Sequence, residues 1–319
     1  GNIATNAGGN RAVKYGTTRD QVYSLEVVVP DGGMTTLGAR LNKKTAGYAL
    51  EQLIMGSEGT LGIVTGATLK LKPLPPHKMD LLAIVTDYDS ATRLVQKIIT
   101  AGGIEPTSIE FMDNLAVRSC ADYIKVRLPH YDDGHYVIIT LDAFGEEELE
   151  RRVTLLDQLC AGNGAAEVLE ADEGRVWKAR RSMADAARAE SSVVYYEDVV
   201  VPVDRVADML GRAAYFEKRY GFLCRIVAHA GDGNIHFTLL KAGLSDQEWH
   251  DKLDAFHEDI YGLAYKMGGR LSGEHGIGCK KIFTMKMYTD PVELALMKKI
   301  KKALDPNNIL NPGKIFGDI

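Results

Sequence analysis

The segment from His229 to His236 reads His-Ala-Gly-Asp-Gly-Asn-Ile-His, so two histidines stand on either side of a Gly-Asp-Gly turn. Apolar runs flank this segment, from Phe222 to Val227 and from Phe237 to Leu240. Two apolar runs around a glycine-rich turn are typical of a β-hairpin. Because a hairpin folds its strands back on each other, we expect the two imidazoles to lie near one point in space.

A second glycine-rich motif, Gly-Glu-His-Gly-Ile-Gly at residues 273–278, supplies a carboxylate and a third imidazole. Two histidines and one glutamate suit a divalent metal that keeps open coordination positions. We therefore predict that His229, His236 and Glu274 are metal ligands. His275 stands beside them and is the candidate for moving a proton. Any one of these histidines alone is more typical of an ordinary loop residue, so the prediction depends on the cluster.

Length and charge exclude several classes of protein. The 319 residues exceed one ordinary domain, and two domains are expected. The net charge is −5 and no long Lys/Arg block occurs, which argues against nucleic-acid binding. No run approaches the roughly 18 apolar residues of a membrane span. The four cysteines have no C-x-x-C spacing, and reduced thiols in a cytoplasmic protein are the simplest interpretation.

The first ten residues, Gly-Asn-Ile-Ala-Thr-Asn-Ala-Gly-Gly-Asn, form a glycine-rich stretch without an initiator Met. They lack the basic and apolar regions of a signal peptide. Since a domain rarely begins in such a loop, we expect the chain to be part of a longer protein.

The pattern of apolar residues predicts a strand-rich first part and a mixed second part. Three prolines between Lys72 and Pro76 form a stiff connector, where we expect a domain boundary. Beyond it, strands alternate with amphipathic helices, which suggests an α+β layer with helices over a sheet. We expect strands at 22–30, 63–71, 80–86, 108–112, 135–142, 167–169 and 193–201, and helices at 47–55, 89–101, 146–160, 172–189, 204–220, 250–267 and 291–303.

These motifs occur together, and in this order, in a known family. They lie at residues 1–9, 56–65, 201–202, 229–236, 273–278 and 305–314. With them the chain resembles the flavin-linked D-2-hydroxy-acid dehydrogenases, which include the glycolate oxidase D subunit, D-lactate dehydrogenase and D-2-hydroxyglutarate dehydrogenase. The family belongs to the vanillyl-alcohol oxidase type of flavoprotein.

The resemblance implies an α+β architecture with three parts. Residues 1–76 resemble the second subdomain of the FAD-binding domain. Residues 77–270 resemble the α+β cap (substrate) domain, which has an antiparallel sheet and lies over the isoalloxazine ring. Residues 271–319 resemble the segment that returns to the flavin. We expect no counterpart here of the family's first flavin subdomain, which carries a glycine-rich loop for the pyrophosphate.

The resemblance also implies where FAD is bound. Small residues allow backbone amides to approach a planar, phosphate-bearing cofactor. A single glycine-rich loop is more typical of an ordinary turn, but two such loops in the family's order favour the cofactor. Asn311 resembles a residue of the returning segment near the flavin ring. The implied FAD contacts are Ile3, Ala4, Thr5, Asn6, Gly8, Gly9, Glu58, Gly59, Gly62, Ile63, Asn234 and Asn311.

Arg180 stands in Trp177-Lys178-Ala179-Arg180 and resembles a family arginine that holds a substrate carboxylate. A guanidinium suits this task because its planar fork pairs with both carboxylate oxygens. Arg181 is adjacent and remains an alternative. Tyr196 occupies the place where relatives that bind a second carboxylate have a lysine, so a small monocarboxylate fits better.

The resulting hypothesis is a FAD-dependent oxidation of a small D-2-hydroxy acid, such as D-lactate or glycolate, to the 2-keto acid. A divalent metal (zinc, manganese or iron(II)) favours ionisation of the substrate hydroxyl, and His275 accepts its proton. Electrons then pass to a partner such as an iron–sulfur subunit or electron-transfer flavoprotein. Two alternatives stay open: a metallohydrolase that uses the same His/His/Glu set, and a non-catalytic or incomplete fragment of a flavin enzyme.

Overall fold

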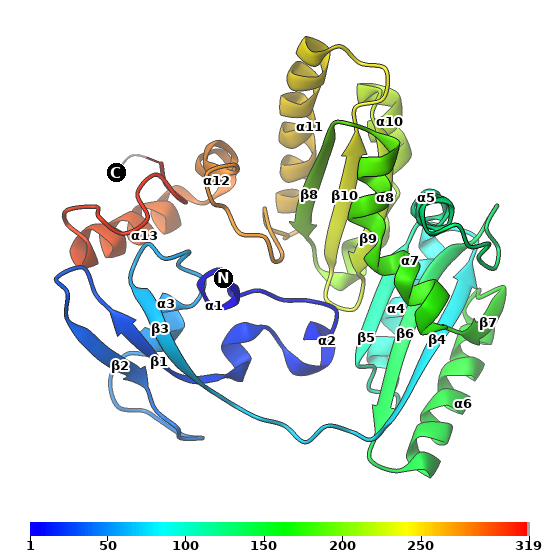
Figure 1. Cartoon of the computed structure of the whole chain (residues 1–319), viewed down its shortest axis with the longest axis horizontal. Coiled ribbons are helices and arrows are strands. Elements are labelled where there is room, and N and C mark those ends of the chain that lie inside the picture. The colour runs from blue at the N-terminus through cyan, green and yellow to red at the C-terminus, as the bar shows by residue number, and fades with distance from the viewer. Residues whose placement is uncertain (318–319) are drawn as a thin grey trace. The chain divides into compact units, whose positions relative to one another are not determined.

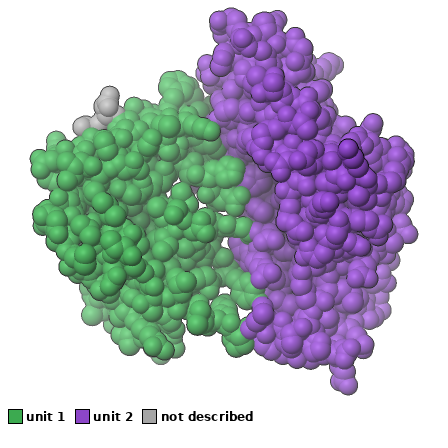
Figure 2. Space-filling model, viewed as in Figure 1, with its two compact units in different colours: residues 1–9, 15–73, 271–319 green, residues 10–14, 74–270 purple. Residues whose placement is uncertain are grey.

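The computed structural model describes residues 1–317, and the described chain forms two compact units (Figure 2). Unit 1 contains residues 1–9, 15–73 and the segment from 271 onward. Unit 2 contains residues 10–14 and 74–270. The chain therefore passes from one unit to the other within the proline-containing connector.

Unit 1 is built on a small antiparallel sheet with the strand order β2-β1-β3 (Figure 1). The central strand buries Val22, Leu25 and Val27, which pack against Ile54 and Leu61. The elements are α1 (Asn2–Thr5), a 3₁₀ turn (Thr18–Gln21), β1 (Val22–Val28), β2 (Met34–Gly38), α3 (Leu50–Ile54), β3 (Ile63–Leu69), α12 (Ile282–Tyr288) and α13 (Pro291–Leu304); α2 (Ala12–Tyr15) falls at the change of units.

A buried lysine joins the C-terminal part of unit 1 to its glycine-rich loop. Lys301 of α13 pairs with Asp305 four residues later. Its ammonium also donates to the carbonyls of Thr60 at 3.0 Å and Leu310 at 2.9 Å. A buried charge is tolerated only when it is paired and hydrogen-bonded in this way. The lysine thus holds the chain after α13 beside the loop at 56–62.

Unit 2 contains a seven-stranded antiparallel sheet in the order β7-β4-β6-β5-β9-β10-β8 (Figure 1). Its elements are β4 (His77–Val85), α4 (Tyr88–Thr100), β5 (Ser108–Met112), α5 (Asn114–Ile124), β6 (His135–Ala143), α6 (Glu146–Gly162), β7 (Glu167–Glu170), a π-helical turn (Glu173–Trp177), α7 (Lys178–Arg181), α8 (Met183–Glu190), β8 (Val194–Val200), a 3₁₀ turn (Val203–Arg205), α9 (Val206–Leu210), α10 (Ala213–Tyr220), β9 (Leu223–His229), β10 (Asn234–Leu240) and α11 (Asp246–Lys266). This mixture of helices with antiparallel sheets is the α+β class expected from the sequence.

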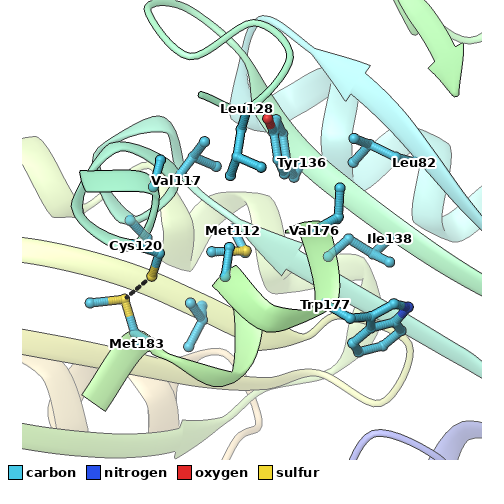
Figure 3. Close-up of a cluster of buried hydrophobic side chains, with 14 of the residues drawn as sticks. Leu82, Met112, Val117, Cys120, Leu128, Tyr136, Ile138, Val176, Trp177 and Met183 are labelled. Carbon is cyan, nitrogen blue, oxygen red and sulfur yellow. Dashed lines mark hydrogen bonds between the residues drawn. The ribbon is translucent and has the colours of Figure 1, made fainter. Parts of the chain in front are cut away.

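Helices cover both faces of the large sheet. On one face, α10 and α11 pack through an aromatic cluster in which Phe216 lies edge-on to Phe237 and Phe256. On the other face, α5, α7 and α8 enclose a second core (Figure 3). Val176 and Trp177 of the π-helical turn are buried in this second core. Their burial fixes the start of α7, and with it the position of Arg180.

Several predicted elements are confirmed and others are corrected. The β-hairpin, the strands at 22–30 and 108–112 and the helix at 146–160 form as predicted, with shifts of at most three residues at their ends. The single helix predicted at 172–189 is wrong. Asp172 caps the backbone amides of Gly174 and Arg175, and the chain then passes through the π-helical turn before α7 and α8. The helix predicted at 204–220 is likewise divided into α9 and α10.

Candidate functional site

One face of the unit 2 sheet carries the polar side chains that the sequence singled out. Paired residues in a sheet share a face, and the face repeats every second residue. Glu110 pairs with His229, and His236 pairs with both Val227 and Asp198. Because Met112 also pairs with Val227, all these side chains lie on the face that α5, α7 and α8 cover.

The hairpin between β9 and β10 brings the two predicted metal-binding histidines together. The ring centroids of His229 and His236 are 5.4 Å apart, and one nitrogen of each lies within 4.8 Å of the other. Gly233 makes the turn possible: its φ is +83°, and a Cβ there would lie 2.0 Å from the carbonyl oxygen of Val201. The prediction that the hairpin gathers both imidazoles is confirmed.

Glu110 connects His229 to Arg180, and the sequence analysis missed this residue. Its carboxylate is only 1% exposed. One oxygen lies 2.7 Å from Nδ1 of His229, and the other lies 2.6 Å from Nη2 of Arg180. The local signal was ambiguous, because a glutamate between Ile109 and Phe111 in an alternating strand usually faces solvent, and it must be paired only if that face is buried.

Arg180 and its neighbour Arg181 occupy different environments. Arg181 is exposed and pairs with Glu173 at 2.9 Å. Arg180 is largely buried, and its Nε has no hydrogen-bond partner among the described residues. A buried donor without a partner is rare and calls for an acceptor. Burial also raises the pKa of the nearby Cys120 thiol to about 12, so this cysteine stays protonated beside Arg180.

Glu274 and His275 belong to unit 1, where Glu58 holds their loop in place. The Glu58 carboxylate accepts hydrogen bonds from the backbone amides of Ile277 and Gly278, each at 2.7 Å. Ser272 accepts from the amide of Gly276 at 2.8 Å. Glycine is required at 276, because its φ is +82° and a Cβ would lie 2.7 Å from Glu58 Oε1. The part that Glu274 and His275 play beside the two hairpin histidines stays a prediction.

The two glycine-rich segments of unit 1 meet at one cavity. A pocket of about 640 Å³ is lined by residues from both. Of the predicted FAD contacts, it includes Ile3, Ala4, Gly59, Gly62 and Ile63. The glycine at 62 is also required by packing, because a Cβ there would lie 2.5 Å from Val27 Cγ1.

Three predicted FAD contacts use their side chains within the protein. Asn6 adopts a left-handed conformation at the end of α1 and accepts from the amide of Arg19 at 2.9 Å. Asn311 donates to the carbonyl of Glu58. Asn234, in unit 2, donates to Asp198 Oδ1 and to the carbonyl of Val199. Contact with FAD stays a prediction for all twelve residues, those that line the cavity included.

The comparison with known proteins identifies the family. Residues 74–315 match the family described as FAD linked oxidases, C-terminal domain, and residues 1–38 match the FAD binding domain family. The chain belongs to the FAD-linked oxidases. It is 35% identical to a D-lactate dehydrogenase of Anaerostipes hadrus, over 99% of this chain and 68% of that protein. It is 36% identical to glycolate oxidase subunit GlcD of Bacillus subtilis (strain 168), over 99% of this chain and 67% of that protein.

Solved structures support the fold of this FAD-linked oxidase. A p-cresol methylhydroxylase with substrate bound aligns with a TM-score of 0.75 at 16% identity, over all of this chain and 69% of that one. A 4-ethylphenol oxidase from Gulosibacter chungangensis aligns with a TM-score of 0.72, also at 16% identity. The fold is therefore the vanillyl-alcohol-oxidase type. No helix among the described residues is both long and apolar enough to span a bilayer.

The residues present fit both implied groups. For FAD, two segments rich in small residues border one cavity of a size that is usual for ligand sites. For a divalent metal, two imidazoles lie close together, and Nδ1 of one of them, His229, lies 2.7 Å from the buried Glu110 carboxylate. Metal-binding histidines are commonly oriented by a carboxylate in this way.

Replacing Glu58 tests how the loop that carries Glu274 and His275 is held. Glu58→Gln leaves one acceptor oxygen for two backbone amides and turns an NH₂ group toward the other amide. We expect a loss of about 1–3 kcal/mol of unfolding free energy and faster hydrogen exchange at Ile277 and Gly278. Glu51→Gln is the control, since Glu51 makes only a 3.4 Å contact with Lys44. Unchanged exchange at the two amides in Glu58→Gln would contradict this role.

Proposed function

We propose that this FAD-linked oxidase oxidises a small D-2-hydroxy acid, such as D-lactate or glycolate, to the 2-keto acid with the help of a divalent metal. Relatives named D-lactate dehydrogenase and glycolate oxidase subunit GlcD match nearly the whole chain, which supports this substrate class. The observation that carries the proposal is the contact of one buried carboxylate, Glu110, with both a predicted metal-binding histidine and a predicted carboxylate-binding arginine.

Each residue has a defined task in the proposed reaction. Arg180 binds the substrate carboxylate, and its unpartnered Nε supplies a donor for one oxygen. His229, His236 and Glu274 hold the metal, and His275 accepts the hydroxyl proton on a ring nitrogen. Loss of that proton, together with loss of the Cα hydrogen as a hydride, turns the C–O single bond into a carbonyl. When bound, FAD supplies the hydride acceptor and the metal supplies a Lewis acid near the hydroxyl.

A small substrate with one carboxylate fits the surroundings of Tyr196. The Tyr196 hydroxyl donates to the carbonyl of Ala184 at 3.0 Å and accepts from Arg188 at 3.3 Å. Arg188 in turn pairs with Asp185. By the resemblance, dicarboxylate-binding relatives place a lysine at this position, which here carries a hydroxyl that already has two hydrogen-bond partners, and the neighbouring cation already has a carboxylate partner. For this reason we propose lactate or glycolate ahead of a dicarboxylate.

The electrons leave to a protein partner in the proposed cycle, and we propose an iron–sulfur subunit or electron-transfer flavoprotein for this role.

The chain carries four cysteines. Cys120, Cys160 and Cys224 are buried, and Cys279 is exposed. Unpaired thiols are compatible with the cytoplasmic location that we propose.

Removing one imidazole tests the metal site. His236→Ala should lower the affinity for Zn²⁺ or Mn²⁺ by about 10-fold or more, because a lost ligand costs at least as much as lost outer-shell support. Elemental analysis and titration calorimetry measure occupancy and affinity. His250→Ala, in an exposed position of α11, is the matched control and should bind metal normally. Full occupancy in His236→Ala would remove this residue from the ligand set.

Substrate binding by two lysine variants distinguishes the proposed role of Arg180 from that of Arg181. Arg180→Lys keeps the charge but loses the planar fork, so substrate binding should weaken by about 1–3 kcal/mol. Arg181→Lys changes a neighbouring exposed residue and should leave KM and kcat near wild type. Steady-state kinetics of the FAD-loaded holoenzyme with D-lactate and glycolate measure both. Equal kinetics for the two variants would show that Arg180 does not bind substrate.

His275→Asn tests the general base. The variant should retain FAD and metal but reduce the flavin about 10²–10⁴-fold more slowly, which is the usual contribution of a general base. Anaerobic stopped-flow mixing of the holoenzyme with D-lactate measures that step. A rate within a few-fold of wild type, with both groups still bound, would exclude His275 as the base.

A further inference from the structure

Glu110 is a buried carboxylate that the proposed reaction does not itself use. It lies in the middle of β5, a strand in which every residue is buried. Ionised groups are costly in such a position unless both oxygens are paired. Glu110 meets this condition with two different partners, Arg180 through Oε2 and His229 through Oε1.

The two contacts of Glu110 have a chemical consequence for His229. An ionised carboxylate is only an acceptor, so Nδ1 of His229 must carry a proton to make its 2.7 Å contact. In a neutral imidazole, a proton on Nδ1 leaves Nε2 with its lone pair. This is the tautomer in which Nε2 binds a metal.

The contact with Arg180 determines how an amide side chain at position 110 would be oriented. A guanidinium has only donors and keeps its charge at any ordinary pH. An amide at position 110 would therefore present its oxygen to Arg180 and its NH₂ group to His229. Nδ1 would then become an acceptor, and the proton of the neutral ring would move to Nε2.

We propose that Glu110 is a positioning residue that sets the tautomer of His229 for metal binding and the orientation of Arg180 for substrate binding; this rests on the proposed function. One carboxylate thus orients both His229, the proposed metal ligand, and Arg180, the proposed carboxylate-binding group. Arg180 contributes to this positioning as well, because it has only donors and therefore orients the oxygen of an amide at position 110 toward itself.

The first test is nitrogen NMR of the metal-free protein with labelled histidine, which reads the tautomer directly. Wild type should carry the His229 proton on Nδ1, and Glu110→Gln should carry it on Nε2. Glu190→Gln is the control, because it replaces another arginine-paired carboxylate of unit 2, 2.9 Å from Arg225. A wild-type proton on Nε2 would overturn the proposal even if the Glu110→Gln variant failed to fold.

The second test measures metal affinity by calorimetry with Mn²⁺ and Zn²⁺. Glu110→Gln should bind about 10–100-fold more weakly than wild type, which is the usual effect of removing an outer-shell partner. Adding Arg180→Met should restore much of this affinity, because the amide at 110 is then able to turn its oxygen to His229. The KM for D-lactate should stay raised in the double variant. A purely structural role predicts a further loss of metal affinity instead of a recovery.

The outcomes separate this inference from the proposed function. If the tautomer follows residue 110 but wild type binds neither cation, the proposed metal chemistry and the metal-binding part of the inference fail, while the control of the His229 tautomer by Glu110 stands. If wild type binds metal, and Glu110→Gln binds it equally well with an unchanged tautomer, the inference fails and the proposed function stands.

Discussion

The arrangement of unit 1 depends on Glu58, which joins segments far apart in the sequence. Its left-handed backbone, with a φ of +52°, places its amide on the carbonyl of Ala4 and its carbonyl on the side chain of Asn311. Its carboxylate holds the backbone of Ile277 and Gly278. A non-glycine residue in this conformation is strained, and four hydrogen bonds offset the strain. The loop that carries Glu274 and His275 thus has a fixed relation to the segments proposed to bind FAD.

In unit 2, ionisable side chains lie on a sheet face that helices cover. Apolar residues of α5, α7 and α8 cover most of that face, and Trp177 anchors the segment before Arg180 in the same core. Glu110 and His229 occupy paired register positions, and the Glu110 carboxylate contacts both His229 and Arg180 of α7. The same packing that stabilises the sheet therefore orients the groups proposed to bind metal and substrate.

The sequence predicted the hairpin because its two strands and turn are contiguous, so local rules suffice. It also predicted the α+β class and the family. It did not predict the break at Glu173–Trp177, because a helical apolar pattern does not reveal a capping aspartate followed by a π-helical turn. Glu110 was missed for a related reason: in an alternating strand a glutamate between Ile109 and Phe111 is typical of the solvent face. Its burial depends on an arginine 70 residues later, a pairing that no local pattern contains.

The proposed mechanism requires a bound metal for flavin reduction by a D-2-hydroxy acid. The rate of flavin reduction with and without metal tests this requirement. The FAD-loaded holoenzyme is mixed with D-lactate or glycolate under anaerobic conditions, and the visible flavin absorbance is followed before and after removal of the metal by a chelator. We expect rapid bleaching in the metal-loaded enzyme, little bleaching after chelation, and recovery when Zn²⁺ or Mn²⁺ is restored. Bleaching at an unchanged rate in protein shown by elemental analysis to be free of metal would contradict it.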